Sequence, residues 1–112
     1  MTEANSEARA AVALLSTAPD ADEAARIART LVEERLAACV NIVPGVRSIY
    51  AWEGKVHDEG ELLLLIKTTV ERRDAVVARI QEVHPYSCPE AVVLPVVGGS
   101  RPYLEWVAEV TR

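Results

Sequence analysis

The segment His84–Glu90 gathers several reactive side chains into one short stretch of this 112-residue chain. Its sequence, His-Pro-Tyr-Ser-Cys-Pro-Glu, supplies an imidazole, a phenol, a thiol and a carboxylate. The two prolines stiffen the backbone, because proline fixes its own φ and favours extended geometry in the residue before it. The segment also stands where a helical pattern stops and a strand pattern starts. It can therefore present ligands to a metal ion, or it can serve only as a rigid connection.

Imidazole and thiolate are the preferred ligands of soft and borderline metal ions. The candidate ligands are therefore His84, the thiols of Cys39 and Cys88, and the harder carboxylate of Glu90. Their spacing contains neither a Cys-x-x-Cys pair nor a His-x-x-x-His pair. A single histidine at a helix end more often interacts with the helix dipole, and a single cysteine at the start of a strand more often packs as a small apolar residue. Local spacing leaves both interpretations open.

Nucleophilic catalysis has less support than metal binding. A cysteine–histidine pair needs a third group that orients the imidazole, and it needs an oxyanion hole. The sequence shows neither of these features. We therefore expect a protein that is not an enzyme.

Two further groups of side chains are candidates for ligand binding. Carboxylates surround a predicted hairpin beside His57, where they can hold a hard cation or simply keep the hairpin in solvent; they are Glu53, Asp58, Glu59 and Glu61. The second group is aromatic and consists of Trp52, Tyr86, Tyr103 and Trp106. If the elements that carry these rings converge, the rings form the wall of a pocket or fill a subunit interface.

Composition restricts the class of protein. The net charge of −5 argues against a nucleic-acid surface, because a phosphate backbone attracts clustered lysine and arginine. No apolar run approaches the roughly 20 residues of a membrane span, and the N-terminus lacks the order of a signal peptide. These observations predict a cytoplasmic protein with reduced cysteines and no membrane partner. We assign residues 1–9 to a flexible arm and residues 10–112 to a single domain.

The predicted elements follow the order β-α-β-β-α-β, with a helix added at the C-terminus. Predicted strands cover residues 10–17, 39–52, 56–67 and 91–97, and predicted helices cover 20–37, 68–83 and a last segment from Ser100. Within the strands, Pro44-Gly45 predicts a bulge or an edge, and Pro95 predicts an edge position. The order is that of an α+β, ferredoxin-like sandwich, in which two helices cover one face of a four-stranded sheet.

The third strand contains an uninterrupted apolar run from Leu62 to Ile66. A strand with one wet face alternates apolar and polar residues, so this run indicates that both of its faces are covered. The two helices cover one face. A second subunit is the expected cover of the other face, and the chain is predicted to form a homo-oligomer. The alternative is that the C-terminal helix folds under the open face.

Several motifs together resemble those of the CutA family, the divalent-cation-tolerance proteins. They span residues 11–109 and are Leu36–Gly45, Tyr50–Lys55, Ile66–Thr68, His84–Tyr86 with Pro89–Glu90, and Tyr103-Leu104 with Trp106. The resemblance implies a ferredoxin-like fold and a tight homotrimer, similar in architecture to the PII signal proteins. It also implies a part in tolerance of copper and other divalent ions, with copper binding but without an accepted enzyme activity.

The resemblance also bears on individual residues. The copper pattern of the family has a cysteine at the end of strand one and a His-His pair before Pro-Tyr, whereas this chain has Ser16, Val83 and His84 there. Of these three positions only His84 keeps a metal ligand, so a site needs either three copies of His84 brought together in a trimer or the participation of Cys39. At other positions this chain keeps the residues of the family, and these positions imply an intersubunit cleft as the functional region. The residues of this cleft are Trp52, Glu61, Lys67, Tyr86, Tyr103 and Trp106.

The leading hypothesis is thus a trimeric protein of the divalent-cation response that binds copper or another divalent cation weakly. One alternative is a PII-like signalling module that binds a small ligand in the clefts between subunits. Another is an interaction scaffold without a ligand. Nucleic acid is not an expected partner under any of these hypotheses.

Overall fold

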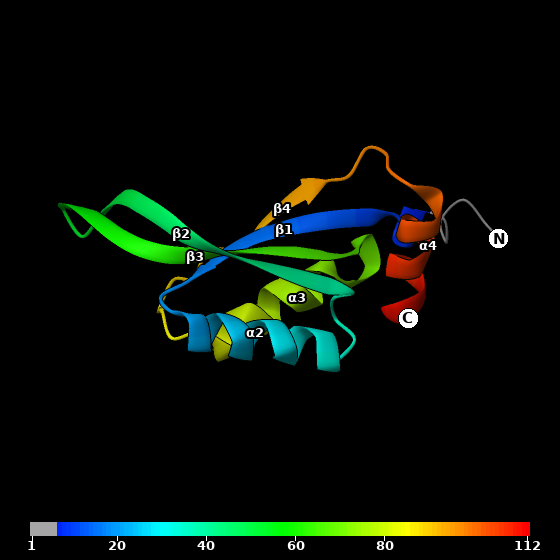
Figure 1. Ribbon diagram of the computed structural model, residues 1–112, viewed down its shortest axis with the longest axis horizontal. Coiled ribbons are helices and arrows are strands. Elements are labelled where there is room, and N and C mark those ends of the chain that lie inside the picture. The colour runs from blue at the N-terminus through cyan, green and yellow to red at the C-terminus, as the bar shows by residue number, and fades with distance from the viewer. Residues whose placement is uncertain (1–6) are drawn as a thin grey trace.

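The computed structural model describes residues 7–112 (Figure 1). Four strands form one antiparallel sheet in the order β2-β3-β1-β4. The elements are β1 (Ala11–Ala18), α2 (Ala21–Glu33), β2 (Cys39–Trp52), β3 (Lys55–Thr69), α3 (Val70–Val83), β4 (Val92–Pro95) and α4 (Arg101–Val110). The predicted α+β, ferredoxin-like order with an added C-terminal helix is confirmed.

Helices α2 and α3 lie side by side on one face of the sheet (Figure 1). The hairpin formed by β2 and β3 projects well beyond these helices, and the molecule extends over 50 × 25 × 25 Å. Helix α4 lies at the end of the sheet opposite the hairpin tip. None of the helices in the described part of the chain is both long and apolar enough to cross a membrane.

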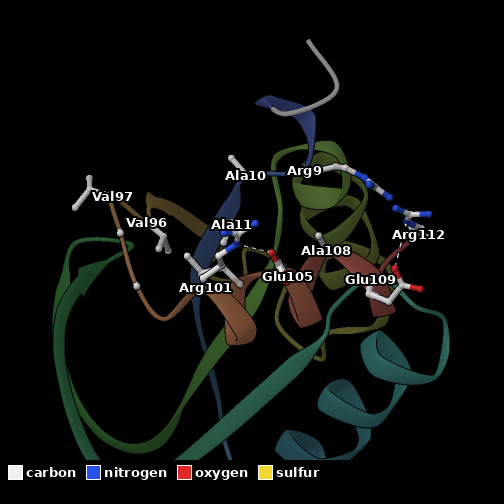
Figure 2. A pocket seen from close by; sticks show the side chains of 13 residues that line it. Arg9, Ala10, Ala11, Val96, Val97, Arg101, Glu105, Ala108, Glu109 and Arg112 are labelled. Carbon is white, nitrogen blue, oxygen red and sulfur yellow. Dashed lines mark hydrogen bonds and ion pairs between the residues drawn. The ribbon is translucent and has the colours of Figure 1, made fainter. Parts of the chain in front are cut away.

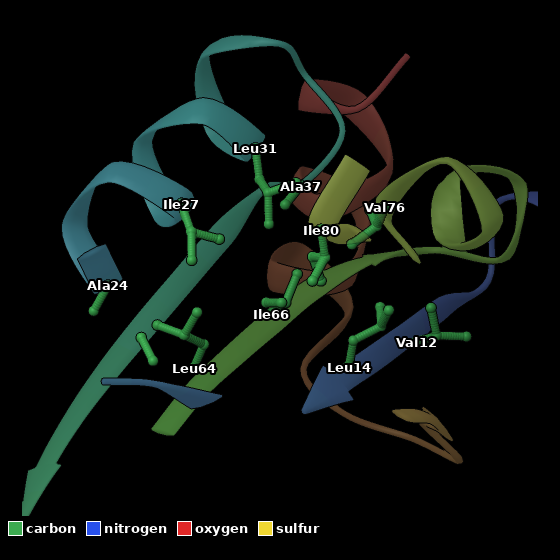
Figure 3. Close-up of a cluster of buried hydrophobic side chains, with 11 residues drawn as sticks. Val12, Leu14, Ala24, Ile27, Leu31, Ala37, Leu64, Ile66, Val76 and Ile80 are labelled. Carbon is green, nitrogen blue, oxygen red and sulfur yellow. The ribbon is translucent and has the colours of Figure 1, made fainter. Parts of the chain in front are cut away.

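The hydrophobic core lies between the sheet and these two helices (Figure 3). Apolar residues recur at helical spacing in α2, where Ala24, Ile27 and Leu31 are fully buried. Asp20 stabilises the start of this helix, because its carboxylate accepts a hydrogen bond of 2.8 Å from the backbone N–H of Glu23. The rest of the core cluster comes from β1, β3, α3 and the segment after α2: Val12, Leu14, Ala18, Ala37, Leu64, Ile66, Val76 and Ile80.

Both long helices differ from the prediction at one end. Helix α2 ends at Glu33 and not near Ala37, because Arg35 adopts a left-handed φ of 61° that turns the chain. Helix α3 begins after Thr69 and not after Thr68. Thr68, the first residue of the predicted helix, instead lies fully buried in β3, where its hydroxyl donates a 2.6 Å hydrogen bond to the carbonyl of Leu36.

The irregular positions of the strands agree with the prediction. The pairing of β2 with β3 shifts register between Val43 and Val46, and Gly45 there has a φ of 82°. The hairpin turns at Glu53-Gly54, where both residues have positive φ as a type I′ turn requires. Strand β4 is an edge strand that ends at Pro95, two residues earlier than predicted.

The predicted arm at residues 1–9 lies mostly outside the described residues. Glu7 and Ala8 are helical and lead through Arg9 into β1.

The sheet face opposite α2 and α3 is the open face. Leu64 and Ile66 are buried beneath the helices, so the alternation of β3 directs Leu63 and Leu65 to the open face, where both are half-buried. By register the same face carries apolar residues from every other strand, namely Leu15, Val43, Val92 and Leu94. Helix α4 does not cover them, since Val43, Val92 and Leu94 are exposed.

Candidate functional site

His84 lies where α3 ends, and its side chain is buried. The backbone N–H of Tyr86 donates to His84 Nδ1 over 3.1 Å, so Nδ1 is the acceptor and Nε2 carries the proton. Nε2 donates to the carbonyl of Thr17 over 2.7 Å. Both ring nitrogens are thus used within the fold, and a metal ion at His84 has to displace one of these hydrogen bonds.

The turn at His84 directs Tyr86 toward β3. The Tyr86 hydroxyl donates a 2.9 Å hydrogen bond to Glu61 Oε2, and its ring lies 4.6 Å from the His84 ring between centroids. Burial raises the pKa of Tyr86, and the hydrogen bond to Glu61 and the negative charges of Glu61 and Glu59 raise it further. Tyr86 therefore stays a neutral hydrogen-bond donor, in a region of negative potential.

Tyr86 and the projecting hairpin enclose a cavity of about 480 Å³, named the hairpin cavity here. It is lined by Thr17, Ser48, Ile49, Tyr50, Trp52, Glu61, Tyr86, Ser87, Cys88 and Glu90. The fold brings three of the predicted cleft residues together in it: Trp52, Glu61 and Tyr86. Sequence reasoning did not assign Tyr50 to this site, although its position two residues before Trp52 places both rings on one face of β2.

The other three predicted cleft residues lie at the opposite end of β3. Lys67 donates a hydrogen bond to Asn41 Oδ1, and the thiol of Cys39 lies 3.9 Å from the same oxygen. The rings of Tyr103 and Trp106 on α4 lie 5.6 Å apart. Burial and the neighbouring Cys39 raise the pKa of Tyr103, which places α4 beside the start of β2. The group Cys39, Asn41, Lys67, Tyr103 and Trp106 is called the Cys39 cluster below.

The hairpin cavity and the Cys39 cluster do not meet within one chain. Glu61 and Lys67 are six residues apart in the same strand, which corresponds to at most about 20 Å. A cleft containing all six predicted residues therefore requires a second copy of the chain.

The two predicted metal ligands are also separated. His84 binds the carbonyl of Thr17, which pairs with Leu63, whereas Cys39 pairs with Lys67. Four residues of β3 correspond to about 13 Å. Within residues 7–112, no three His, Cys, Asp or Glu side chains converge in a way that could hold a metal ion.

The remaining positions of the copper pattern are apolar or unpaired. Ser16 is fully buried, and its hydroxyl has no hydrogen-bond partner among the described residues, while Val83 packs against the core.

Two of the hairpin carboxylates, Asp58 and Glu59, each have a partner within the hairpin. Asp58 forms an ion pair of 2.6 Å with Arg47, whose hydrogen bond lowers the pKa of Asp58. Glu59 accepts a 2.9 Å hydrogen bond from Tyr50 and lies 3.7 Å from His57. Among the described residues these carboxylates do not gather into a group that could hold a metal ion.

A larger hollow of about 740 Å³ lies between the start of β1 and α4 (Figure 2). It contains none of the predicted site residues. Arg101 and Arg112 at its rim are paired with Glu105 and Glu109 at 2.8 and 3.7 Å. Val97 beside them is 99% exposed, so this hollow is open surface.

The fold and its motifs can be compared with known proteins. The family described as CutA1 divalent ion tolerance protein matches residues 12–110, nearly the whole chain. The chain belongs to this family. A relative from Thermus thermophilus, named divalent-cation tolerance protein CutA, is 52% identical over 98 residues, which are 88% of this chain and 95% of the relative.

Solved structures of the family have the same fold. The crystal structure of CutA from Xylella fastidiosa superposes with a TM-score of 0.89 at 41% identity, covering 91% of this chain and 98% of that one. The structure of the divalent cation tolerance protein from Thermus thermophilus gives a TM-score of 0.88 at 50% identity, covering 91% and 99%. The family membership expected from the motifs is thus confirmed, together with the fold.

The expectation of a purely cytoplasmic location is wrong for this family. The relative from Arabidopsis thaliana, 41% identical over 98% of this chain, is named chloroplastic, and this chain covers 60% of its length. A rice relative is also named chloroplastic, and the structure from Archaeoglobus fulgidus is described as periplasmic. Relatives with this fold are thus named for several compartments, so the composition and charge of the domain do not indicate its cellular location.

Proposed function

We propose that this chain acts in the tolerance of divalent cations. The observation that carries the proposal is the 52% identity to the Thermus thermophilus divalent-cation tolerance protein, which extends over nearly the full length of both chains. The structural match to the Thermus thermophilus protein, with a TM-score of 0.88 over 91% of this chain, supports it. The proposed role is cation binding and response, and not catalysis.

We also propose that the working unit is a homotrimer. The open face exposes an apolar surface that includes Leu15, Leu63, Leu65 and Leu94, and a soluble monomer rarely leaves such a patch uncovered. Strand β2 is a long edge that carries unpaired backbone groups and is able to pair with a neighbour. Packing between subunits would cover both features and join the hairpin cavity of one chain to the Cys39 cluster of another.

Copper or another divalent cation is the proposed ligand. Cys39 is the better candidate of the two predicted ligands, because its half-buried thiol lies 3.9 Å from Asn41 and beside Tyr103 and is not held by two hydrogen bonds in the way that the imidazole of His84 is. His84, by contrast, already uses both ring nitrogens. One thiolate does not make a metal site, so this proposal requires further ligands from the neighbouring subunits.

Growth at rising concentrations of Cu²⁺ or Zn²⁺ tests the function. The host is a bacterial strain that lacks its own family member and expresses this chain or one of its variants. We expect the wild-type chain to restore tolerance, Cys39→Ser to reduce it, and Cys88→Ser to leave it unchanged. The Cys88→Ser variant is the matched control, because it removes the exposed thiol of the hairpin cavity. Failure of the wild-type chain to restore growth contradicts the proposed function.

Metal binding to the purified, reduced variants identifies the ligands. Zn²⁺ is titrated by calorimetry, and copper(I) is titrated against a competing chromophoric chelator. We expect Cys39→Ser to weaken binding about ten-fold or more, since the loss of a group that only orients a ligand already costs about that much. Binding that survives Cys39→Ser but is lost in His84→Ala would move the site to the other end of β3.

A further inference from the structure

Charged side chains are nearly absent from the body of the sheet, which is the part without the projecting hairpin. The body consists of β1, β4, residues 39–46 of β2 and residues 61–69 of β3. Among these residues Glu61 is the only acidic one, and Lys67 is the only basic one. Both are odd-numbered positions of β3, as are Leu63 and Leu65, so all four side chains lie on the open face.

Glu61 lacks a counter-charge from its own chain, although only 8% of its surface is exposed. The neutral hydroxyl of Tyr86 donates a hydrogen bond to its Oε2 atom. No basic side chain within residues 7–112 forms an ion pair with it. Burying a carboxylate is costly unless a cation or several hydrogen bonds compensate its charge. Covering the open face would remove the remaining water from Glu61, so the cover has to bring a cation.

Lys67 is in the corresponding position with the opposite charge. Its side chain is half-buried, and its ammonium group donates a hydrogen bond to the neutral side-chain oxygen of Asn41. Within the described residues it forms no ion pair. Because an ammonium group has three donors, a carboxylate can bind to Lys67 without displacing Asn41.

These two charges cannot neutralise each other within one chain. They stand six residues apart on the same strand, and the side chains of Leu63 and Leu65 lie between them on the same face. A second copy of the chain is not restricted in this way. If its sheet body covers the open face, the only basic side chain that this body brings to Glu61 is Lys67.

We propose that Glu61 of one copy forms an ion pair with Lys67 of the next copy at every interface of the trimer. The inference rests on the homotrimer proposed above and names the contact that orients its subunits. In a closed ring each copy presents Glu61 to one neighbour and Lys67 to the other, so no charge is left without a partner.

The apolar and the charged parts of the open face then have different roles. Contacts between leucine side chains stabilise association but have little directionality. The ion pair fixes the register, because a shifted arrangement separates the two charges and leaves a carboxylate buried without a partner.

A double-mutant cycle of neutral substitutions tests this ion pair. The variants of the full chain are Glu61→Gln, Lys67→Gln and the combination of both. The trimer is dissociated with urea at low salt and one fixed protein concentration, at a temperature raised until the wild type dissociates, and sedimentation velocity measures the midpoint. Urea is used because it is uncharged and does not screen ion pairs as a salt does.

We expect Lys67→Gln to weaken each interface about ten-fold or more, because it leaves the Glu61 charge buried alone. In the Glu61→Gln background, the same substitution should have at most about half of this effect on the midpoint. Residues as far apart as these two are in one chain have additive effects, so a departure from additivity reports contact between copies.

Exchange of the two charges is a second, independent test. Glu61→Lys alone places like charges at each interface and should prevent assembly. Adding Lys67→Glu to this variant exchanges the two charges and should restore the trimer. Glu33→Lys is the matched control: it reverses a charge on α2, where Glu33 is exposed and lies 3.9 Å from Arg29, and it should leave the trimer intact.

The ion pair and the trimer can fail separately in these experiments. A trimeric wild type in which Lys67→Gln has the same effect in both backgrounds overturns the ion pair and leaves the trimer standing. Failure of Lys67→Glu to restore assembly of the Glu61→Lys variant overturns the pair as well, even if Glu61→Lys alone does not fold. A monomeric wild type instead overturns the proposed trimer, and the ion pair with it.

Discussion

Ser16 and Thr68 are two fully buried hydroxyl groups in opposite hydrogen-bonding states. Both lie on strands that pair with each other, and both have 0% exposure. The Ser16 hydroxyl has no hydrogen-bond partner within residues 7–112, whereas Thr68 donates to the carbonyl of Leu36 over 2.6 Å. Removing each hydroxyl should therefore change the free energy of unfolding in opposite directions.

The magnitudes follow from the cost of burying an unpaired polar group, which is about 1–3 kcal/mol. Ser16→Ala removes such a group and loses few contacts, so we expect the free energy of unfolding to rise by about 1 kcal/mol. Thr68→Val keeps the shape of the side chain but leaves the Leu36 carbonyl without its donor. We expect that variant to lose about 1–3 kcal/mol. A change of 1 kcal/mol corresponds to roughly 4–8 °C in Tm for a domain near this size.

Unfolding in guanidinium chloride at one fixed protein concentration measures both changes. The concentration must be fixed because the stability of an oligomer depends on it. Unchanged m-values would show that the compactness of the two states is preserved. The reasoning is refuted if Ser16→Ala destabilises the protein by about 1 kcal/mol or more, because its hydroxyl must then have a partner.

Two further predictions concern the surface. Arg79 donates a hydrogen bond to Glu34, and this bond lowers the pKa of the Glu34 carboxyl below 4.5. The pair therefore stabilises the folded state above about pH 4.5, and this stabilisation is lost as the pH falls through the pKa of Glu34 in the folded state. Glu34→Gln should therefore reduce the loss of stability on acidification, measured as denaturation midpoints from pH 6 to about pH 3, and an unchanged acid profile argues against the pair. On the open face, Leu65→Lys should dissociate the proposed trimer, whose mass is three times the 12.2 kDa of one chain, while Val32→Lys on the exposed side of α2 should not. Sedimentation velocity measures both, and a wild-type monomer would contradict the trimer itself.

The regular helices and strands, and the bulge and edge positions that interrupt the strands, could be predicted from the sequence. Helical spacing located the buried side of α2, and the pair Pro44-Gly45 located the bulge of β2, because these signals depend on backbone chemistry within a few residues. Pro95 likewise indicated an edge strand, since it cannot donate to a sheet.

Element ends could not be predicted in the same way. The sequence around Thr68 has the spacing of a helix cap, but pairing with Val12 of β1 keeps this residue in the strand. A contact between Thr68 and Leu36, far apart in sequence, decides where α3 begins. Such contacts depend on how the helices pack on the sheet, and local patterns do not contain that information.

The candidate site, too, could be predicted from the sequence only in part. The sequence by itself determined the family, the order of elements and the presence of an aromatic and acidic group at Trp52, Glu61 and Tyr86. Only the tertiary structure decided that Lys67, Tyr103 and Trp106 stand apart from them, and that both nitrogens of His84 are occupied. The reason is physical: residue types set which chemistry is available, whereas strand register and length set the distances over which side chains can share a ligand.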